Sequence, residues 1–305
     1  MSTEAIDPRS ADLDLRSSLE VATLMLAANE RAVAVVGAAL PAIAAAVDAI
    51  AARMRDGGRL LYVGAGTSGR LAVLDAAECV PTFSTPPELV RAILAGGEEA
   101  LVHSVEGAED DADGGRAAIA REAVGPADSV VGIAASGSTP FVRGALAEAR
   151  ARGALTAAIS CVAPAPILDA ADLPIPVPTG AEVLAGSTRL AAGTAQKLVL
   201  NMLSTGVMVR LGRVHGNRMI DVAVTNAKLR RRAIGIVGDL AAVDAAEAER
   251  LLDASGLEVR TAVAMGRLGV GADEARQRLA ASGGSLRAAL GDGRPDRRSD
   301  GPVTR

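Results

Sequence analysis

The apolar and polar positions along the chain change their period several times. In the first sixty residues, apolar side chains recur at helical spacing, at Leu19, Val21, Ala22, Met25 and Leu26. Pro41 begins a second, alanine-rich stretch that ends at the turn sequence Asp56-Gly57-Gly58. This pattern predicts two long helices ahead of any strand.

Short apolar runs then alternate with helical patterns. The runs have the length of buried strands and cover residues 60–63, 90–97, 130–135, 154–161 and 173–179. Strands that alternate with helices form parallel sheets covered on both faces. The predicted fold class is therefore α/β, a Rossmann-like three-layer sandwich in which helices flank a parallel sheet.

The pattern changes again around residues 228–232. Helix-sized segments separated by glycine or serine follow without a strand, and the last residues carry too few apolar side chains to fold. We expect four parts: N-terminal helices over residues 1–54 that pack on the sheet domain, a ligand-binding sheet domain over 55–230, a small helical domain over 231–291, and a solvated tail over 292–305.

Composition narrows the possible partners. Aromatic residues make up 1% of the 305 residues, namely Tyr62, Phe83 and Phe141, which comes close to excluding a stacking platform for single-stranded nucleic acid. The formal net charge of −4 provides no basic field for a polyanion. We therefore expect no nucleic-acid partner.

Compartment and metal binding depend on a few residues. Two cysteines, Cys79 and Cys161, are too few for a disulfide framework, and the polar, acidic N-terminal segment differs from a signal peptide, so we expect a cytoplasmic protein. The longest uncharged apolar run, residues 32–47, is shorter than the ~20 residues that span a bilayer, which argues against a membrane segment. His103 and His215 lie far apart and outside any metal-ligand spacing, so no metal site is expected.

A glycine-rich loop follows the first predicted strand. Gly64, Gly66 and Gly69 satisfy the G-x-G-x-x-G pattern of a dinucleotide-binding turn. Glu98 or Glu99, after the next strand, could contact a ribose. A nicotinamide dehydrogenase is therefore one candidate function.

Hydroxyl groups in this loop favour a compact phosphate monoester instead. Thr67 and Ser68 lie among the free N–H groups of a helix N-terminus, where a phosphate finds several donors. The design is repeated after a later strand, at Ser136, Gly137, Ser138 and Thr139. Each loop alone could equally be an ordinary helix N-cap. Because loops after parallel strands open at one sheet edge, the pair makes phosphate the better interpretation.

Two glutamates near these loops are candidates for acid and base chemistry. Glu78 lies in an otherwise apolar helical stretch, where a carboxylate would be partly desolvated, as suits a general acid. Glu109 follows Gly107 in a loop or at a helix start, where it could act as a base. From spacing alone, a surface glutamate and first-turn helix acids are the favoured interpretations.

Four longer motifs carry a family resemblance. GAGTSGRLAVLDAAECVPTF, VEGAEDD, GIAASGSTP and GSTRLAAGTAQKLVLNMLSTG occur in the order typical of the N-acetylmuramic acid 6-phosphate etherases, members of the sugar isomerase (SIS) domain group. The resemblance runs from about Ser18 to Leu229. It implies an SIS domain that binds a sugar phosphate. It also implies a carbon–oxygen lyase that cleaves the C3 lactyl ether of N-acetylmuramic acid 6-phosphate to N-acetylglucosamine 6-phosphate and D-lactate, in cell-wall amino-sugar catabolism or recycling.

The resemblance also implies roles for particular residues. The family's catalytic glutamates match Glu78, which would protonate the departing lactate and later activate water, and Glu109, which would remove the C2 proton. Its phosphate and sugar contacts match Thr67, Ser68, Ser136, Gly137, Ser138, Thr139, Thr188 and Arg189. The reaction needs no cofactor, and SIS domains usually pair, so a homodimer without a cofactor is expected.

Two positions depart from the family pattern. Ser138 stands where the family commonly carries arginine, so a charge-assisted contact is lost there. His215 stands where an aromatic residue is usual.

Two further functions use the same type of domain. A sugar-phosphate isomerase would use the same loops with a single base. A regulator resembling the glucokinase regulatory proteins would sense a sugar phosphate without catalysis, but those regulators resemble two SIS domains in one chain, and this chain has room for one.

Overall fold

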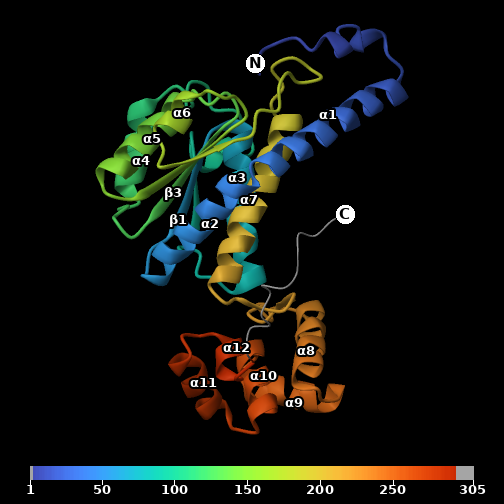
Figure 1. Cartoon of the computed structure of the whole chain (residues 1–305), viewed down its shortest axis with the longest axis vertical. Coiled ribbons are helices and arrows are strands. Elements are labelled where there is room, and N and C mark those ends of the chain that lie inside the picture. Colours follow the sequence, from blue (N-terminus) through green and yellow to red (C-terminus); the bar gives the residue numbers. More distant parts are fainter. Residues whose placement is uncertain (1–2, 293–305) are drawn as a thin grey trace. The chain divides into compact units, whose positions relative to one another are not determined.

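The computed structural model describes residues 3–292 and divides the chain into two compact units (Figure 1). The sheet unit comprises the chain up to Val80 together with Thr85–Leu211, and the helical unit comprises Pro81–Ser84 together with the chain from Gly212 onward. The division between the units therefore lies ahead of the boundary expected at residue 230. The expected tail lies, from residue 293 onward, outside the described residues.

The sheet unit is built on five parallel strands in the order β2-β1-β3-β4-β5. These strands are β1 (Leu60–Gly64), β2 (Val90–Leu94), β3 (Ser129–Ala134), β4 (Leu155–Ser160) and β5 (Leu173–Pro176). Every residue of β1 and β3 is buried because helices cover both faces, and these strands are therefore continuous apolar runs in the sequence. The predicted α/β class is confirmed.

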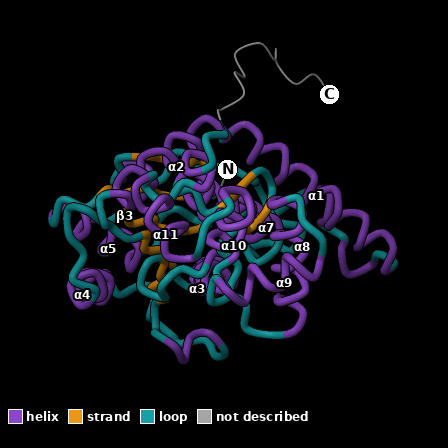
Figure 2. The backbone as a smooth tube through the Cα atoms, turned by 90° about the horizontal axis from the view of Figure 1, so that it is seen from below, coloured by secondary structure: helices purple, strands orange, loops and turns teal. Residues whose placement is uncertain are grey.

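Helices cover the two faces of this sheet in separate groups (Figure 1), and Figure 2 shows the strands in orange among the purple helices. One face carries α4 (Ala112–Arg121), α5 (Pro140–Ala151) and α6 (Pro166–Asp169). The other carries α2 (Leu40–Arg55), α3 (Gly66–Phe83) and α7 (Ala191–Arg210), and α1 (Ser18–Ala38) packs on α7. Short 3₁₀ turns lie at Pro8–Ser10, Leu13–Leu15 and Glu98–Leu101. Along β1, Leu61 and Val63 pack into the core with α5, whereas Tyr62 points to α3, as the alternation of a strand requires.

Helix α1 has a well-capped N-terminus, but few of its side chains are buried. Ser17 Oγ accepts the N–H of Glu20, and the Glu20 carboxylate accepts the N–H of Ser17, which forms a capping box. The buried residues of α1 are Ala28, Ala32 and Val36. By length and composition alone α1 could span a membrane, and 17% of its most apolar window is buried. The longest uncharged run in the sequence does not reveal this helix as a possible membrane span, because Glu20, Glu30 and Arg31 interrupt its apolar residues.

Helices α4 and α5 approach each other closely through two glycines. A Cβ on Gly115 of α4 would lie 2.0 Å from Phe141 O, and one on Gly144 of α5 would lie 2.0 Å from Ala112 O. Only glycine fits at such a backbone contact. Because α4 follows Glu109 and α5 follows the second hydroxyl loop, this contact brings those two segments together.

The helical unit contains a short antiparallel hairpin and a helical bundle. The hairpin consists of β6 (Val214–His215) and β7 (Arg218–Met219), and the helices are α8 (Ala227–Ala241), α9 (Ala245–Ala254), α10 (Val259–Leu268), α11 (Ala272–Ala281) and α12 (Leu286–Ala289). The sequence pattern does not predict the hairpin. Ile220 and Val222, just after it, are buried in one core with the helices. Arg213 and Arg260 both donate to the Asp221 carboxylate, at 3.1 and 2.8 Å, which ties this segment to α10. These contacts draw the chain ahead of residue 230 into the helical unit.

Candidate active site

The two hydroxyl-rich loops lie beside each other at one edge of the sheet. β1 and β3 are parallel neighbours, with Gly64 opposite Ile133, and each strand runs directly into its loop. Ligands of open α/β sheets bind at the carboxyl ends of the strands. The strand order therefore places both loops at one edge of the sheet, as the sequence predicts.

The first loop turns sharply from β1 into α3. Gly66 has φ +52°, and a Cβ on Gly69 would lie 2.3 Å from Leu94 Cδ1 and 2.7 Å from Gly64 O. Glycine at both positions lets the helix start directly at the end of the strand. Thr67 and Ser68 consequently lie in the first turn of α3, where backbone N–H groups have no partner within the helix.

The second loop exposes its hydroxyl groups. Ser136 and Ser138 are exposed, and Ser138 directs both its N–H and its hydroxyl at Ser136 Oγ, at 3.3 and 3.1 Å. Thr139 is the N-cap of α5, but its side chain makes no capping hydrogen bond. The alternative that these hydroxyls serve only as N-caps therefore does not describe this loop.

Ser68 is placed differently from the other hydroxyl residues. It is buried, and its hydroxyl donates to Gln196 Oε1 of α7 at 3.0 Å. Gln196 is itself fully buried. Sequence reasoning missed this glutamine, although it lies in the GSTRLAAGTAQK motif, because nothing in the spacing indicates that its side chain reaches the first loop.

The GSTR segment packs against the first loop through α7. A Cβ on Gly193 would lie 3.4 Å from Thr188 O and 3.6 Å from Thr67 Cγ2, so Thr67 and Thr188 lie on the same side of α7. Arg189 is exposed. The N-terminus of α7 is already occupied by a carboxylate: Glu182 is buried and accepts two N–H groups, those of Ala191 and Ala192, at 2.9 Å each. An anion is thus left with the N-termini of α3 and α5.

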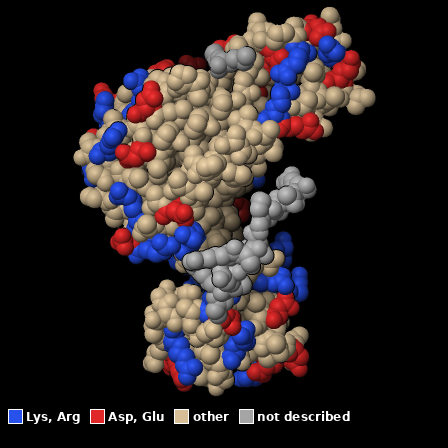
Figure 3. Space-filling view, viewed as in Figure 1, with Lys and Arg blue, Asp and Glu red and all other residues tan. Residues whose placement is uncertain are grey.

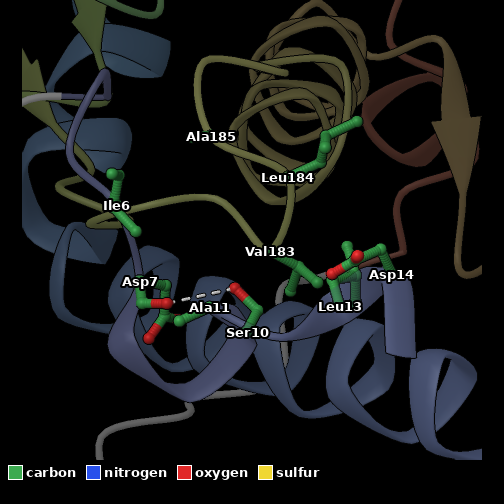
Figure 4. Close-up of a pocket in the computed structure, with 9 residues that line it drawn as sticks. All are labelled: Ile6, Asp7, Ser10, Ala11, Leu13, Asp14, Val183, Leu184 and Ala185. Carbon is green, nitrogen blue, oxygen red and sulfur yellow. Dashed lines mark hydrogen bonds between the residues drawn. The ribbon is translucent and has the colours of Figure 1, made fainter. Parts of the chain in front are cut away.

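The N-terminal arm supports the segment ahead of GSTR. A cavity of about 450 Å³ lies between residues 6–14 and 183–185 (Figure 4). On one wall of it, Ser10 Oγ donates to the backbone oxygen of Asp7 at 3.2 Å within the 3₁₀ turn Pro8–Ser10. The buried Asp7 carboxylate accepts hydrogen bonds from the guanidinium group and the backbone N–H of Arg9, which lower the pKa of that carboxyl group. The buried charge in this cavity is therefore already compensated.

Glu78 lies on the outer face of α3. The expectation that its carboxylate is partly desolvated is wrong, because Glu78 is exposed in the single chain. Helical phase explains this: Ala72, Asp75 and Cys79 take the buried face of α3, and Glu78 lies roughly 60° around the helix from Asp75, outside that face. It lies nine residues after Gly69, about 14 Å along the helix from the loop.

A buried carboxylate one turn before Glu78 was not foreseen. Asp75 Oδ2 accepts the hydroxyl of Tyr62 at 3.0 Å, and Oδ1 accepts Asn201 Nδ2 at 2.7 Å and Ser204 Oγ at 3.1 Å. Burial and the Asp75 charge raise the pKa of Tyr62 well above its usual range, and the same causes raise the pKa of Cys79 to about 12. These bonds connect β1, α3 and α7, the three elements that carry the first loop, Glu78 and the GSTR motif.

Glu109 lies in a turn directly before α4. Its carbonyl oxygen accepts the N–H of Phe141 at 3.0 Å, so Glu109 adjoins the start of α5 and the second hydroxyl loop. The N-cap of α4 is Asp111, which accepts the N–H of Gly114 at 2.7 Å. Glu109 is exposed, and because Asp111 caps α4, helix capping does not account for an acidic residue at position 109. Farther back in the same segment, Arg70 of α3 donates to Ala100 O at 2.9 Å.

Family comparisons agree with the two-unit structure. A model of the glucokinase regulatory protein N-terminal SIS domain matches residues 42–150, and a model of the C-terminal lid domain of that protein matches residues 216–259. Among solved structures, a phosphoheptose isomerase from Francisella tularensis matches with a TM-score of 0.47 and 19% identity, over 63% of this chain and 98% of that one.

Curated relatives match over most of the chain. The N-acetylmuramic acid 6-phosphate etherase of Gloeobacter violaceus is 56% identical over 263 residues, 86% of each chain. The protein of the same name from Trichormus variabilis is 55% identical over 271 residues, 89% of this chain and 88% of the relative. With this identity across nearly the whole length of both chains, the protein belongs to the N-acetylmuramic acid 6-phosphate etherase family.

Proposed function

We propose that this chain cleaves the C3 lactyl ether of N-acetylmuramic acid 6-phosphate, giving N-acetylglucosamine 6-phosphate and D-lactate. The observation that carries the proposal is the pair of hydroxyl loops after the neighbouring strands β1 and β3, with Glu109 hydrogen-bonded to the start of α5. Its curated relatives bear the name of this activity. The described residues form one five-stranded sheet, which fits a single SIS domain better than a regulator with two such domains.

The phosphate would bind at the N-termini of α3 and α5. Thr67 and Ser68 serve the first, and Ser136, Ser138 and Thr139 serve the second. Because Glu182 occupies the N-terminus of α7, Thr188 and Arg189 are better suited to the sugar. Ser138 supplies a neutral hydroxyl where the family commonly has a guanidinium group, so the phosphate gains less charge compensation.

The proposed reaction is an elimination followed by addition of water. Ring opening exposes an aldehyde at C1 and makes the C2 proton acidic. Glu109 removes that proton, the C3–O bond breaks, and Glu78 protonates the departing lactate oxygen. Glu78 then activates water, which adds to C3 of the unsaturated aldehyde while C2 regains a proton. Anchoring the remote phosphate lets binding energy position C2 and C3 between the carboxylates.

The direct test is release of D-lactate from N-acetylmuramic acid 6-phosphate without added cofactor. Glu78→Ala and Glu109→Ala should each abolish release without changing the circular dichroism spectrum. Glu88→Ala, an exposed glutamate just ahead of β2 at the opposite sheet edge, is the matched control and should keep full activity. Folded wild-type protein that releases no D-lactate would refute the etherase assignment.

Isotopes separate the mechanism from the substrate assignment. In heavy water, the N-acetylglucosamine 6-phosphate formed should carry deuterium at C2, because C2 loses and regains a proton. Unlabelled product would remove the elimination mechanism and leave the substrate assignment standing. Conversion of an amino-sugar phosphate between aldose and ketose without D-lactate would identify an isomerase, and binding without turnover would identify a regulator.

We also propose that two copies pair through α1. Large apolar side chains, 49–77% exposed, repeat every seven residues along this helix and into α2, at Leu19, Leu26, Val33 and Leu40. Much of the visible face of the sheet unit is also uncharged (Figure 3). A second copy of the same stripe is a natural cover for such a seam.

Light scattering tests the pairing. The wild-type protein should have twice the chain mass, and the double variant Leu26→Glu/Val33→Glu should have the mass of a single chain. Val209→Glu, an exposed apolar position on α7 outside the stripe, should leave the mass unchanged. An intact dimer of the double variant would contradict this interface.

The proposed compartment is the cytoplasm. A charged sugar phosphate as substrate supports it, and pairing would cover the apolar stripe of α1. Cell fractionation should recover the protein with soluble markers. Recovery with membranes after a salt wash would instead favour α1 as a membrane anchor.

A further inference from the structure

Gln196 is a buried amide with one of its two polar atoms unpaired. Its Oε1 accepts the hydroxyl of Ser68 at 3.0 Å, whereas Nε2 is buried and has no hydrogen-bond partner among the described residues. Buried amide donors are nearly always satisfied. The arrangement therefore leaves the Nε2 donor of Gln196 unpaired directly beneath the first hydroxyl loop.

The direction of the Ser68 hydroxyl matters for phosphate binding. A serine hydroxyl has one proton to donate. While that proton is directed at Gln196 Oε1, it cannot be directed at a phosphate oxygen, and the serine oxygen itself offers only lone pairs to an anion. The arrangement therefore holds Ser68 in the wrong orientation for its expected ligand.

The surroundings of Gln196 allow the opposite orientation. The amide oxygen and nitrogen have nearly the same shape, so a half-turn of the terminal torsion exchanges them. Cys161 lies beside the amide and beside Thr179, and burial together with the Glu182 charge raises the pKa of its thiol to about 12. The protonated thiol donates to Ala192 O at 3.7 Å in this structure, and a turn about its Cα–Cβ bond would let it donate to Oε1 instead.

We propose that Gln196 is a positioning residue that directs the Ser68 hydroxyl toward a bound sugar phosphate. In the bound state Nε2 donates to Ser68 Oγ, the Cys161 thiol donates to Oε1, and the Ser68 proton is donated to a phosphate oxygen. Ser68, Gln196 and Cys161 then each donate one hydrogen bond. This proposal rests on the proposed phosphate site and adds Gln196 as the residue that orients its Ser68 hydroxyl.

Two substitutions separate this role from simple packing. Gln196→Glu leaves only acceptors facing Ser68, so the hydroxyl stays directed inward, and it adds a negative charge near the phosphate. Gln196→Met keeps the length of the side chain but neither accepts nor donates, which frees the hydroxyl without supporting it. Gln277→Met is the matched control, because Gln277 is exposed on α11 in the helical unit.

Binding of N-acetylglucosamine 6-phosphate, measured by titration calorimetry, tests the proposal without relying on ether cleavage. We expect Gln196→Glu to weaken binding roughly tenfold or more and Gln196→Met about threefold, with Gln277→Met unchanged. N-acetylglucosamine without phosphate should not discriminate among the variants. For N-acetylmuramic acid 6-phosphate, KM should rise while kcat changes little, since the chemistry at C2 and C3 is remote.

The decisive measurement is the same pair of substitutions in a Ser68→Ala background. If Gln196 acts through Ser68, its substitutions should have little further effect there, whereas a packing defect would persist. Equal affinity of Gln196→Glu and wild type, or full effects in the Ser68→Ala background, would overturn the proposal, as would wild-type protein that does not bind the sugar phosphate. Binding that follows this pattern without D-lactate release would instead refute the proposed reaction alone.

Discussion

The substitution Tyr62→Phe isolates the hydrogen bond that the chain's single tyrosine donates to a buried carboxylate. Tyr62 is fully buried in β1, and its hydroxyl is 3.0 Å from Asp75 Oδ2. The other oxygen, Oδ1, keeps its bonds from Asn201 and Ser204. Phenylalanine fills the same space, so the variant removes one bond and leaves Oδ2 without that donor.

The expected cost follows from the charge on the acceptor. A hydrogen bond to a charged group contributes about 1.5–3 kcal/mol, so we expect the loss of this one to cost about 2 kcal/mol. For a unit of about this size, a loss of about 2 kcal/mol lowers the melting temperature by about 4–8 °C. Because the network links β1, α3 and α7, we also expect reduced activity through Glu78.

Circular dichroism is the suitable assay, because the chain has no tryptophan and the variant removes its tyrosine. With two units, unfolding can show two transitions, and only that of the sheet unit should move. An unchanged melting temperature at pH 7 would refute the assigned role of the network.

The pH dependence provides a second check. The pKa of Tyr62 is raised on folding, so its contribution is fully present below about pH 10 and is lost as the pH rises further, because the unfolded chain then releases the proton more readily. The wild type should therefore lose stability above pH 10 faster than the variant, and the difference between them should narrow. A constant difference would contradict burial of the hydroxyl.

Three further predictions concern other parts of the chain. Gly144→Ala would force α5 away from α4 and should lower the free energy of unfolding, measured by chemical denaturation, by about 3 kcal/mol. Gly235→Ala in α8, where a Cβ meets nothing, should raise it by about 0.4–1 kcal/mol. Similar effects of the two variants would contradict the close helix contact. Glu182→Ala leaves two buried N–H groups of α7 unpaired and should cost about 2 kcal/mol, and no change would show that water replaces the cap. Burial, reinforced by nearby arginines, lowers the pKa of His215, so the stability that the neutral imidazole contributes is present above about pH 6.5 and is lost as the pH falls. In melting curves between pH 7 and 5, His215→Phe should lose less stability than the wild type, by at most about 1.4 kcal/mol per pH unit. An equal pH dependence in both proteins would refute this prediction.

The strands and the loops could be foreseen because their signals are local. A buried parallel strand must be a continuous apolar run, and β1 and β3 are such runs. The turn into α3 needs glycine at Gly66 and Gly69 for steric reasons that act over a few residues. Hydroxyls next to such turns therefore predict the proposed phosphate site from local sequence alone.

The orientation of the acidic residues depends on distant parts of the chain. Asp75 and Glu78 are both acidic residues in one apolar helix, and their order alone does not say which is buried. Asp75 turns inward because Tyr62 and two side chains of α7 supply its donors, and Glu78 is thereby left outside. Residues more than a hundred positions apart make that choice.

Local periodicity thus accounts for the parallel sheet, the helices that alternate with its strands and the sheet edge of the proposed ligand site, but not for the hairpin of β6 and β7. It does not account for the Glu182 cap on α7, the Gln196 amide beneath Ser68, or the approach of Glu109 to the second loop through the glycine contact of α4 and α5. The Gln196 and glycine contacts are matches between segments far apart in sequence, and the Glu182 cap depends on how the loop ahead of α7 folds back on the helix. A buried polar group is tolerated only where the folded chain brings it a partner, and that partner exists only once the chain has folded.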